Sequence, residues 1–538
     1  MAQAVGPLRP GELAHLPAVA DANSGWSYQF EEDGSGARIA ENWKGTRVRD
    51  AEISFAIGAG LMDRAYVARV GELQWFAPLE VVSTRAVRRP ALAPGHSIHP
   101  GLRFATPITE ECLACHTDQL PPRAYPLNLR PVPGTWRPEG ISCAACHGRV
   151  DAHVTYQETG SGGDPIFVPN RSDPIASVSL CARCHLQGDA SLLLEPGARG
   201  NVPPGGDMLE RRAVYVAAEP TDEIGFVSQV ERLVLSRCFT ASLTPGRTPL
   251  TCVTCHDPHR SAFEAPERAV VRGKCTQCHE SATATSRACS LPPDRRGSQG
   301  CVDCHMRRTP PFDVASVEIH DHWIRTTVGP PSQIKALRTK ESQDGRLAVF
   351  AWPRRARPSY ADDPGLRMMA LMSLGRGDLA LPFADREPGP TAARLPTYHH
   401  LRGSLLEQAK RLDDARTAYE RALAIEPGQA ETAVNLGALL GRLGLARSGV
   451  VHLDNVISNH PQAEGALRNR GILRYVRGDG DGFAADLEAA FAILPQASVA
   501  RALAQHYATI GRDDLARRWD QAARKLQPDE PVGVRKGG

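Results

Sequence analysis

The stretch Cys112-Leu-Ala-Cys115-His116 is the first of six five-residue sequence motifs of the form Cys-x-x-Cys-His, which we call words. These motifs decide how the chain is organised. The other five are Cys143-Ala-Ala-Cys146-His147, Cys181-Ala-Arg-Cys184-His185, Cys252-Val-Thr-Cys255-His256, Cys275-Thr-Gln-Cys278-His279 and Cys301-Val-Asp-Cys304-His305. Two thiols one helical turn apart can form thioethers to the two vinyl groups of one haem, and the following His then lies beneath the iron as an axial ligand. The Cys and His frequencies of this chain predict about 0.01 such words by chance. The words therefore predict covalently bound haem c, with six copies in this chain.

Zinc ribbons and disulfide frameworks also use pairs of cysteines. Neither requires a His after every second Cys, and here all six words have one. The words use all of the cysteines except Cys238 and Cys289, which are expected to be buried or disulfide-linked rather than ligands. Haem attachment is the interpretation that accounts for the complete pattern.

The haem-bearing region is too short to build an ordinary apolar core. Between Cys112 and His305 each haem has only about 32 residues around it. The haems themselves are expected to form the core, with loops wrapped around them. Arginine side chains suit propionate carboxylates because the guanidinium group can bind them through two hydrogen bonds, and Arg183, Arg260 and Arg307 are candidates for this.

The formal net charge of +3 leaves out the cofactors. A ferric haem with two axial His ligands and two ionised propionates carries about −1, so six haems bring the protein to roughly −3. This net negative charge excludes nucleic acid, which is also negatively charged, as a partner. Haem c is attached outside the cytoplasm, so a periplasmic or otherwise exported protein is expected, although residues 1–24 lack the basic and apolar regions of a signal peptide. No stretch approaches the length of a membrane span.

The composition predicts a multidomain chain with three kinds of structure. Residues 1–90 are expected to be β-rich, because runs of alternating apolar and polar residues surround an Asp33-Gly34 turn signal. Residues 91–328, dense in Pro and Gly, should form a loop-rich multihaem domain with few regular elements. Residues 329–365 resemble a linker, and residues 531–538 are expected to be a disordered tail.

Residues 366–530 show a 34-residue period that indicates an α-solenoid. The period is carried by Gly403, Gly437 and Gly471 and by Pro427, Pro461, Pro495 and Pro528. In the best copy, Gly403, Ala415, Tyr419, Ala422 and Pro427 occupy the small, small, aromatic, small and helix-stop positions of a tetratricopeptide repeat. The copies are 396–429, 430–463, 464–497 and a weaker 498–530, and a degenerate cap is expected at residues 364–380.

A low-spin haem iron needs a second axial ligand, usually His or Met. His153 and His259 lie too close to their own words to reach the far face of the same haem, so each is expected to serve a neighbouring iron. His322 and His320 are two residues apart, and only one of them is expected to be a ligand. His96 and His99 are further candidates, whereas His15 is expected to be an ordinary surface residue.

Several segments resemble the multihaem c-type cytochromes with doubled CXXCH motifs that carry a C-terminal tetratricopeptide array. The resemblance runs through most of the chain, in residues 57–78, 140–154, 179–190, 236–260 and 301–324. It implies that His153, His259 and His322 are axial ligands. That family usually opens with a signal peptide and one more CxxCH word, followed by a Trp and a His. This chain lacks them, which leads to the hypothesis that Met1 is an internal methionine and that the natural protein has a seventh haem.

These features favour an electron carrier that moves electrons between redox partner proteins, with the repeats as a protein-docking surface. One alternative is a multihaem reductase or oxidase of a small nitrogen or sulfur compound, which needs one iron with an open coordination position. Another is an assembly scaffold in which the haems only sense redox state. No catalytic side chain is assigned.

The haem count can be tested by measuring the intact mass of the exported protein. We expect the mass to exceed that of the polypeptide by six haem groups, because each word holds one haem through two thioethers. A seventh haem, together with extra N-terminal residues, would support the longer natural chain. A mass increase below six haems would contradict the assignment of the words.

Overall fold

The computed structural model describes residues 4–34, 36–60, 63–83, 88–94, 103–169, 173–196, 202–260, 271, 273–277, 279, 301–314, 317–326, 328 and 346–527. The chain divides into two compact units, each of which gathers separate stretches of sequence. One unit comprises Met1–Gln3, Ala114–Asp118 and Gly140–Ala393, and the other Ala4–Leu113, Gln119–Glu139 and Arg394–Gly538. Each unit is described below by itself.

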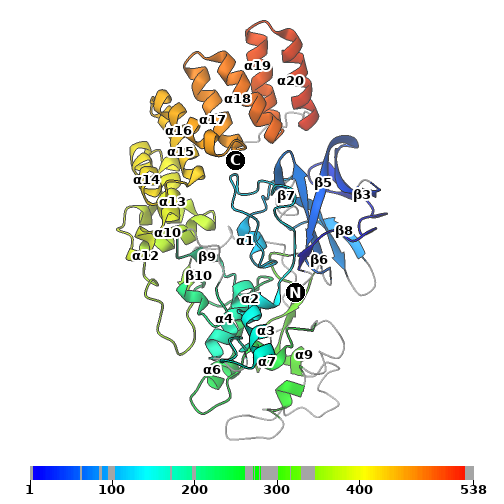
Figure 1. Cartoon of the computed structure of the whole chain (residues 1–538), viewed down its shortest axis with the longest axis vertical. Coiled ribbons are helices and arrows are strands. Elements are labelled where there is room, and N and C mark those ends of the chain that lie inside the picture. Colours follow the sequence, from blue (N-terminus) through cyan, green and yellow to red (C-terminus); the bar gives the residue numbers. More distant parts are fainter. Residues whose placement is uncertain are drawn as a thin grey trace. The chain divides into compact units, whose positions relative to one another are not determined.

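The second of these units begins with the expected β-rich segment, an antiparallel sheet drawn in blue in Figure 1. In the described residues the sheet has eight strands, ordered β2-β3-β4-β5-β6-β7-β8 with β1 paired to β5. The strands are β1 (Val5–Gly6), β2 (Val19–Ala20), β3 (Trp26–Asp33), β4 (Gly36–Trp43), β5 (Thr46–Ile57), β6 (Asp63–Val70), β7 (Leu73–Ser83) and β8 (Arg88–Leu92). Asp33 pairs with Gly36, so the turn lies at the predicted position.

Alternating side chains of this sheet enter two apolar clusters. One cluster contains Trp26, Tyr28, Phe30, Ile39 and Tyr66, all nearly inaccessible to solvent. The other is built on Phe55, Ile57 and Val67 and also contains Ile108 and Leu113. Leu113 ends helix α1 (Glu110–Leu113) and lies inside the first Cys-x-x-Cys-His word. The sheet therefore supports the start of that word directly.

The same unit contains the helical repeats, drawn from yellow to red in Figure 1. Successive helices pair within the predicted copies. The first helix of each of the first three copies begins at the predicted boundary, residue 396, 430 or 464, and that of the fourth copy begins one residue before residue 498. The helices are α13 (Pro396–Gln408), α14 (Leu412–Ile425), α15 (Ala430–Arg442), α16 (Ala446–Asn459), α17 (Glu464–Val476), α18 (Gly480–Ile493), α19 (Ala497–Thr509) and α20 (Asp513–Leu526). The C-terminal region is thus a helical repeat array, as the 34-residue period predicted.

The periodic glycines are explained by contacts between the two helices of a copy. A Cβ atom on Gly403 would lie 2.6 Å from the ring of Tyr419, and one on Gly437 would lie 2.7 Å from Leu453. A Cβ on Gly471 would lie 2.7 Å from Leu487. Each glycine therefore admits a large side chain that lies sixteen positions later in the sequence, which is why a small residue recurs at this place.

Residues 119–139 connect the sheet and the repeats within this unit. The backbone of Asn128 accepts a hydrogen bond from Gln74 N at 2.8 Å, and Arg130 N donates to Glu72 O at 3.0 Å. Tyr125 packs into the apolar cluster of α15–α17, and its ring centre lies 5.8 Å from that of His460. A stretch that lies between the first two haem words is therefore part of the sheet-and-repeat unit.

The other unit holds the remaining Cys-x-x-Cys-His words in short elements joined by long loops. Its strands are β9 (Ala190–Leu193), β10 (Arg212–Ala217), β11 (Arg308–Thr309), β12 (Ile319–His320) and β13 (Leu347–Val349). Its helices are α2 (Cys143–His147), α3 (Val150–Thr159), α4 (Pro174–His185), η2 (Met208–Glu210), α5 (Gln229–Leu233), α6 (Arg237–Ser242), α7 (Cys252–Cys255), α9 (Cys301–His305), α10 (Pro364–Ser373), α11 (Gly377–Ala384) and α12 (Pro390–Ala393).

The stretch expected to be a linker, residues 329–365, is folded in its second half. Strand β13 pairs antiparallel with β10, and Phe350 and Trp352 are buried in the apolar cluster of this unit. The alternation in Leu347–Val349 is too short to stand out from a Pro- and Arg-rich surrounding sequence, and only pairing with β10 makes it a strand. The first half of the expected linker and the expected tail, residues 531–538, lie outside the described residues.

The expected cap before the repeats is a helical hairpin, formed by α10 and α11. It packs with the unit that contains the haem words. Among the described residues, none of the helices combines the length and apolarity that crossing a membrane requires.

A buried carboxyl pair makes the stability of the sheet depend on pH. Glu80 is 1% exposed, and burial, followed by the neighbouring Asp63 carboxyl, raises the pKa of Glu80 to about 9 from an ordinary value of 4.5. Folding therefore takes up protons between these values, and the free energy of unfolding falls as pH rises through this window.

We expect Glu80→Gln to remove much of this dependence, because glutamine stays neutral. Wild type should lose up to about 1.4 kcal/mol of stability per pH unit between pH 6 and pH 9, and the variant should lose less. Calorimetric melting at both pH values measures the difference. Glu52→Gln is the control, since the Glu52 side chain is 57% exposed beside Arg69. Equal slopes for the two variants would contradict the assignment.

Candidate functional site

The Cys-x-x-Cys-His words lie on short helical segments, which sets the direction of their side chains. The second and sixth words are α2 and α9, the third word ends α4, and the fourth begins with α7. In the fifth word, residues 275–277 and 279 are also helical. Side chains three positions apart share one face of a helix, so the two thiols of a word can reach the same group.

Different words approach one another through their cysteines. Cys115 Sγ lies 3.8 Å from Arg183 O, and Cys184 Sγ lies 3.7 Å from Cys115 O. These contacts join the first word to the third. The thiols of Cys181 and Cys252 interact and join the third word to the fourth. Contact between the Cys275 and Cys301 thiols joins the fifth word to the sixth, and burial raises the pKa of Cys275 to about 11.

Several word histidines hold one ring nitrogen against an oxygen. His147 Nδ1 lies 2.8 Å from Phe167 O, His305 Nδ1 lies 2.7 Å from Arg325 O, and His185 Nδ1 lies 3.0 Å from Gln229 Oε1. An Nδ1–H that donates to an oxygen fixes the tautomer and leaves Nε2 as the basic nitrogen. This is the arrangement that an imidazole needs in order to bind a metal through Nε2.

Two of the expected additional ligands show the same arrangement. His153 Nδ1 lies 2.7 Å from Asp164 Oδ1, and His322 Nδ1 lies 3.0 Å from His320 O. Asp164 and Phe167 lie on the same loop, residues 160–167, which follows helix α3. This loop therefore holds both His147 and His153.

Two pairs of histidine rings have a separation that fits a haem iron. The ring centres of His147 and His259 lie 6.0 Å apart with an angle of 2° between the planes, and those of His256 and His322 lie 6.1 Å apart with an angle of 33°. An imidazole nitrogen binds a metal at about 2 Å, so two imidazoles on opposite sides of one metal have ring centres about 6 Å apart. Each pair joins a word histidine to a histidine that the sequence marked as a candidate second ligand.

The environment of His322 favours the neutral imidazole. Burial, followed by the neighbouring His256, lowers the pKa of His322 to about 4. Neutral imidazole is the form that coordinates metals. His259 differs, because its side chain is 74% exposed and has its Nδ1 3.3 Å from Asp257 Oδ1.

Residues 320–325 are held by a buried hydrogen-bond network of Arg232, Ser236 and Asp321, which we call the 320–325 clamp. Arg232 Nε and Nη2 donate to the two carboxylate oxygens of Asp321 at 2.9 and 2.7 Å. Ser236 Oγ donates to His322 O at 2.7 Å and accepts from Ile324 N at 2.8 Å. These contacts hold the backbone on both sides of the His322 ring without touching the ring itself.

The 320–325 clamp also contacts the sixth word and the residues that follow it. Strand β12 pairs with β11, which follows His305 closely, and Asp321 N donates to Arg307 O at 2.7 Å. The carbonyl of Arg325 accepts from His305 Nδ1. One short segment therefore carries the ring that faces His256 and the oxygen that orients His305.

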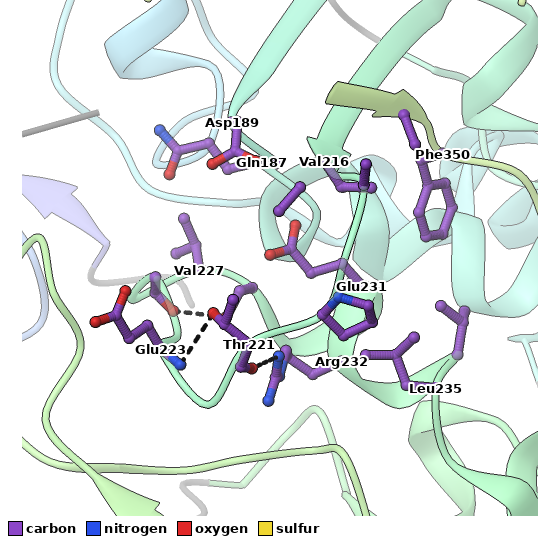
Figure 2. A pocket seen from close by; sticks show the side chains of 18 of the residues that line it. Gln187, Asp189, Val216, Thr221, Glu223, Val227, Glu231, Arg232, Leu235 and Phe350 are labelled. Atoms are coloured by element: carbon purple, nitrogen blue, oxygen red, sulfur yellow. Dashed lines mark hydrogen bonds between the residues drawn. The ribbon is translucent and has the colours of Figure 1, made fainter. Parts of the chain in front are cut away.

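A cavity of about 290 Å³ lies beside the clamp and is shown in Figure 2. Its lining includes Gln187, Glu223, Glu231 and Arg232. Arg232 Nη1 donates to Thr221 O at 2.8 Å, and Glu223 N donates to Thr221 Oγ1 at 3.3 Å. Arg232 thus contributes to the wall of the cavity while its other nitrogens hold Asp321.

Other candidates from the sequence are not paired in this way. His320 lies in β12 and supplies the carbonyl that orients His322. The two ring pairs do not include His116, His185, His279 or His305, and the His153 ring lies against the Asp164 carboxylate. His96, His99, Cys278 and Cys289 lie outside the described residues, and Cys238 is a half-buried residue of α6.

The three arginines proposed for propionates have different surroundings. Arg183 Nη1 donates to Ala145 O at 2.5 Å, and Arg260 is 64% exposed beside Asp257. Arg307 is 3% exposed and lies 2.8 Å from Asp222. Sequence reasoning missed Arg232, Asp321 and Ser236. The partners in these hydrogen bonds lie 86 to 89 positions apart, so no pattern of neighbouring residues could indicate them.

The paired histidines and paired thiols fit the donor set of a covalently bound haem. Among the described residues, no three His, Cys, Asp or Glu side chains gather into a cluster that could hold a metal ion. A haem iron needs only two protein ligands, because the porphyrin supplies the other four. Pairs of histidines next to paired thiols are therefore the appropriate donor set.

Comparison with protein families supports this type of motif. A family model described as "Doubled CXXCH motif" matches residues 268–309, which contain the fifth and sixth words. The match supports a c-type cytochrome-like haem-binding motif in this part of the chain. No curated protein matches the chain.

Several solved structures are similar to part of the chain. A MamA protein labelled MSR-1 is 19% identical, with a TM-score of 0.27, and the match covers 30% of this chain and 94% of that one. PilW, a widely conserved type IV pilus biogenesis factor, is 20% identical with a TM-score of 0.28, covering 31% and 78%. YrrB, a TPR protein with an unusual peptide-binding site, is 19% identical with a TM-score of 0.27, covering 31% and 86%.

The pairing of His259 with His147 can be tested by substitution. We expect His259→Ala to leave one haem with an open coordination position, giving a new high-spin electron paramagnetic resonance signal in the holoprotein. His452→Ala is the matched control, because His452 is an exposed residue of α16. An unchanged low-spin spectrum for His259→Ala would contradict the pairing.

Proposed function

We propose that this chain is an exported multihaem c-type cytochrome that transfers electrons between redox partner proteins. The observation that carries this proposal is the succession of contacts between haem words. The first, third and fourth words contact in sequence through their cysteines, and the fifth contacts the sixth. Such proximity is what passage of electrons along the molecule requires.

The chain's own residues would hold and orient the cofactors. Twelve cysteines would attach six haems, and His116, His147, His185, His256, His279 and His305 would be the first axial ligands. His153, His259 and His322 would be second ligands, with His96, His99 and His320 as further candidates. Bound haem supplies a reversible one-electron couple, whose potential depends on the axial ligands, the hydrogen bonds and the burial around it.

Burial at His322 indicates how the protein would keep these positions stable. The clamp of Arg232, Asp321 and Ser236 fixes the backbone of His322, and the ring has little contact with water. A backbone fixed in this way would limit how far the His322 ring moves when the charge on a bound iron changes, which keeps the reorganisation energy of electron transfer low. These properties suit electron transfer, and no step of it needs a catalytic side chain.

The helical repeats would supply a docking surface for a partner protein. Their described surface includes exposed apolar side chains at Val451, Ile472, Tyr475, Val476 and Ile510. Solenoids of stacked helix pairs commonly bind proteins along their extended surfaces. Export to the periplasm or beyond follows from the chemistry of haem attachment, which takes place outside the cytoplasm.

Spin state separates this function from that of an enzyme with an open iron. For the full-length holoprotein we expect an entirely low-spin electron paramagnetic resonance spectrum and no binding of carbon monoxide after reduction. The physical reason is that every iron then has two strong axial ligands. Carbon monoxide binding by the wild-type protein would instead favour the reductase or oxidase alternative.

A further inference from the structure

Arg307 is a buried cation whose hydrogen-bonding capacity is not used up. Its side chain is 3% exposed, and one of its terminal nitrogens lies 2.8 Å from Asp222 Oδ2. Its Nε atom is buried and meets no acceptor among the residues that the structure describes. The Nε atom of Arg325 is also buried and meets no acceptor among the described residues. Buried guanidinium groups are costly unless an acceptor satisfies their N–H groups.

The ion pairs that involve these two groups include three arginines and two aspartates. Arg232, Arg307 and Arg325 bring three positive charges, whereas Asp321 and Asp222 bring two negative ones. Asp321 is fully buried, but the Asp222 side chain is 47% exposed, so water screens part of its charge. Arg307 and Arg325 therefore keep buried N–H groups that meet no acceptor among the described residues, and a carboxylate is the group that would satisfy them.

The cluster lies next to the sixth haem word. Arg307 follows His305 by two positions, and its carbonyl accepts from Asp321 N. Arg325 orients His305 through its own carbonyl at 2.7 Å. Both guanidinium groups are thus attached to the backbone that positions the His305 ring.

We propose that Arg307, together with Arg325, binds a propionate carboxylate of the haem attached at Cys301 and Cys304 and raises the reduction potential of that haem. The inference rests on the proposed haem binding and adds the residues that tune one particular haem. Reduction of an iron adds one electron, and a nearby buried positive charge stabilises the added negative charge. A planar guanidinium group can bind a carboxylate through two N–H groups, which a lysine cannot do.

The experiment is a potentiometric titration of the full-length holoprotein carrying Arg307→Gln. We expect one haem to have at least a tenfold weaker affinity for its electron, which corresponds to about 59 mV for a one-electron couple. Arg307→Lys restores the positive charge and should return most of the shift. Arg308→Gln is the matched control, because Arg308 is 62% exposed and pairs with Glu318 on the surface. Arg308→Gln should leave all potentials unchanged.

Intact mass and peptide mapping accompany each titration and separate the possible outcomes. Unchanged potentials in Arg307→Gln, with all haems attached, would overturn the inference. Loss of haem from the Cys301–His305 peptide alone, with retention in Arg307→Lys, would support it, whereas loss from other words would overturn it. A wild-type chain that carries no haem would instead defeat the proposed function, so the two failures can be distinguished.

Discussion

The ion pair between Arg232 and Asp321 is the contact on which the arrangement of the fourth and sixth words depends. It joins α5 to the segment before His322 through two short hydrogen bonds in an almost completely buried position. Removing either partner would leave an unpaired buried charge, which typically costs 3–5 kcal/mol. Ser236 adds two hydrogen bonds to the same segment. The centre of the Trp323 ring lies 5.0 Å from the guanidinium carbon of Arg232 and 4.3 Å from that of Arg325. His322 and His305 are therefore held by the same short segment, so a disturbance of this segment affects both side chains.

Local patterns in the sequence predicted those features that depend on local geometry. The thiol spacing needs only one helical turn, and the repeat period needs only that Gly403 lie opposite Tyr419 across a helix pair. The alternation in β3 and β6 reports which face of the sheet is buried. The selection of His259 and His322 depended on the supply of histidines and on the family resemblance, and both rings lie against word histidines. Their role as axial ligands stays a prediction.

Features that depend on long-range contacts could not be predicted in this way. Nothing around Arg232 distinguishes it from the other arginines of the chain, because its partner lies 89 positions later. Similarly, Arg307, Arg183 and Arg260 were equivalent candidates until burial separated them. The strand Leu347–Val349 exists because β10 offers it an edge, not because its three residues prefer an extended backbone. Electrostatic context and strand pairing are properties of the assembled fold.

The position of residues 119–139 has a consequence for the order in which the fold can be completed. Tyr125 packs against helices that are among the last parts of the chain to be synthesised, yet it lies between the first two attachment words. Its packing site does not exist until those helices have folded, so this stretch must wait for a much later part of the chain before it reaches its final environment. The sheet, residues 119–139 and the repeats belong to one compact unit, and the repeats therefore cannot be regarded as a detachable addition.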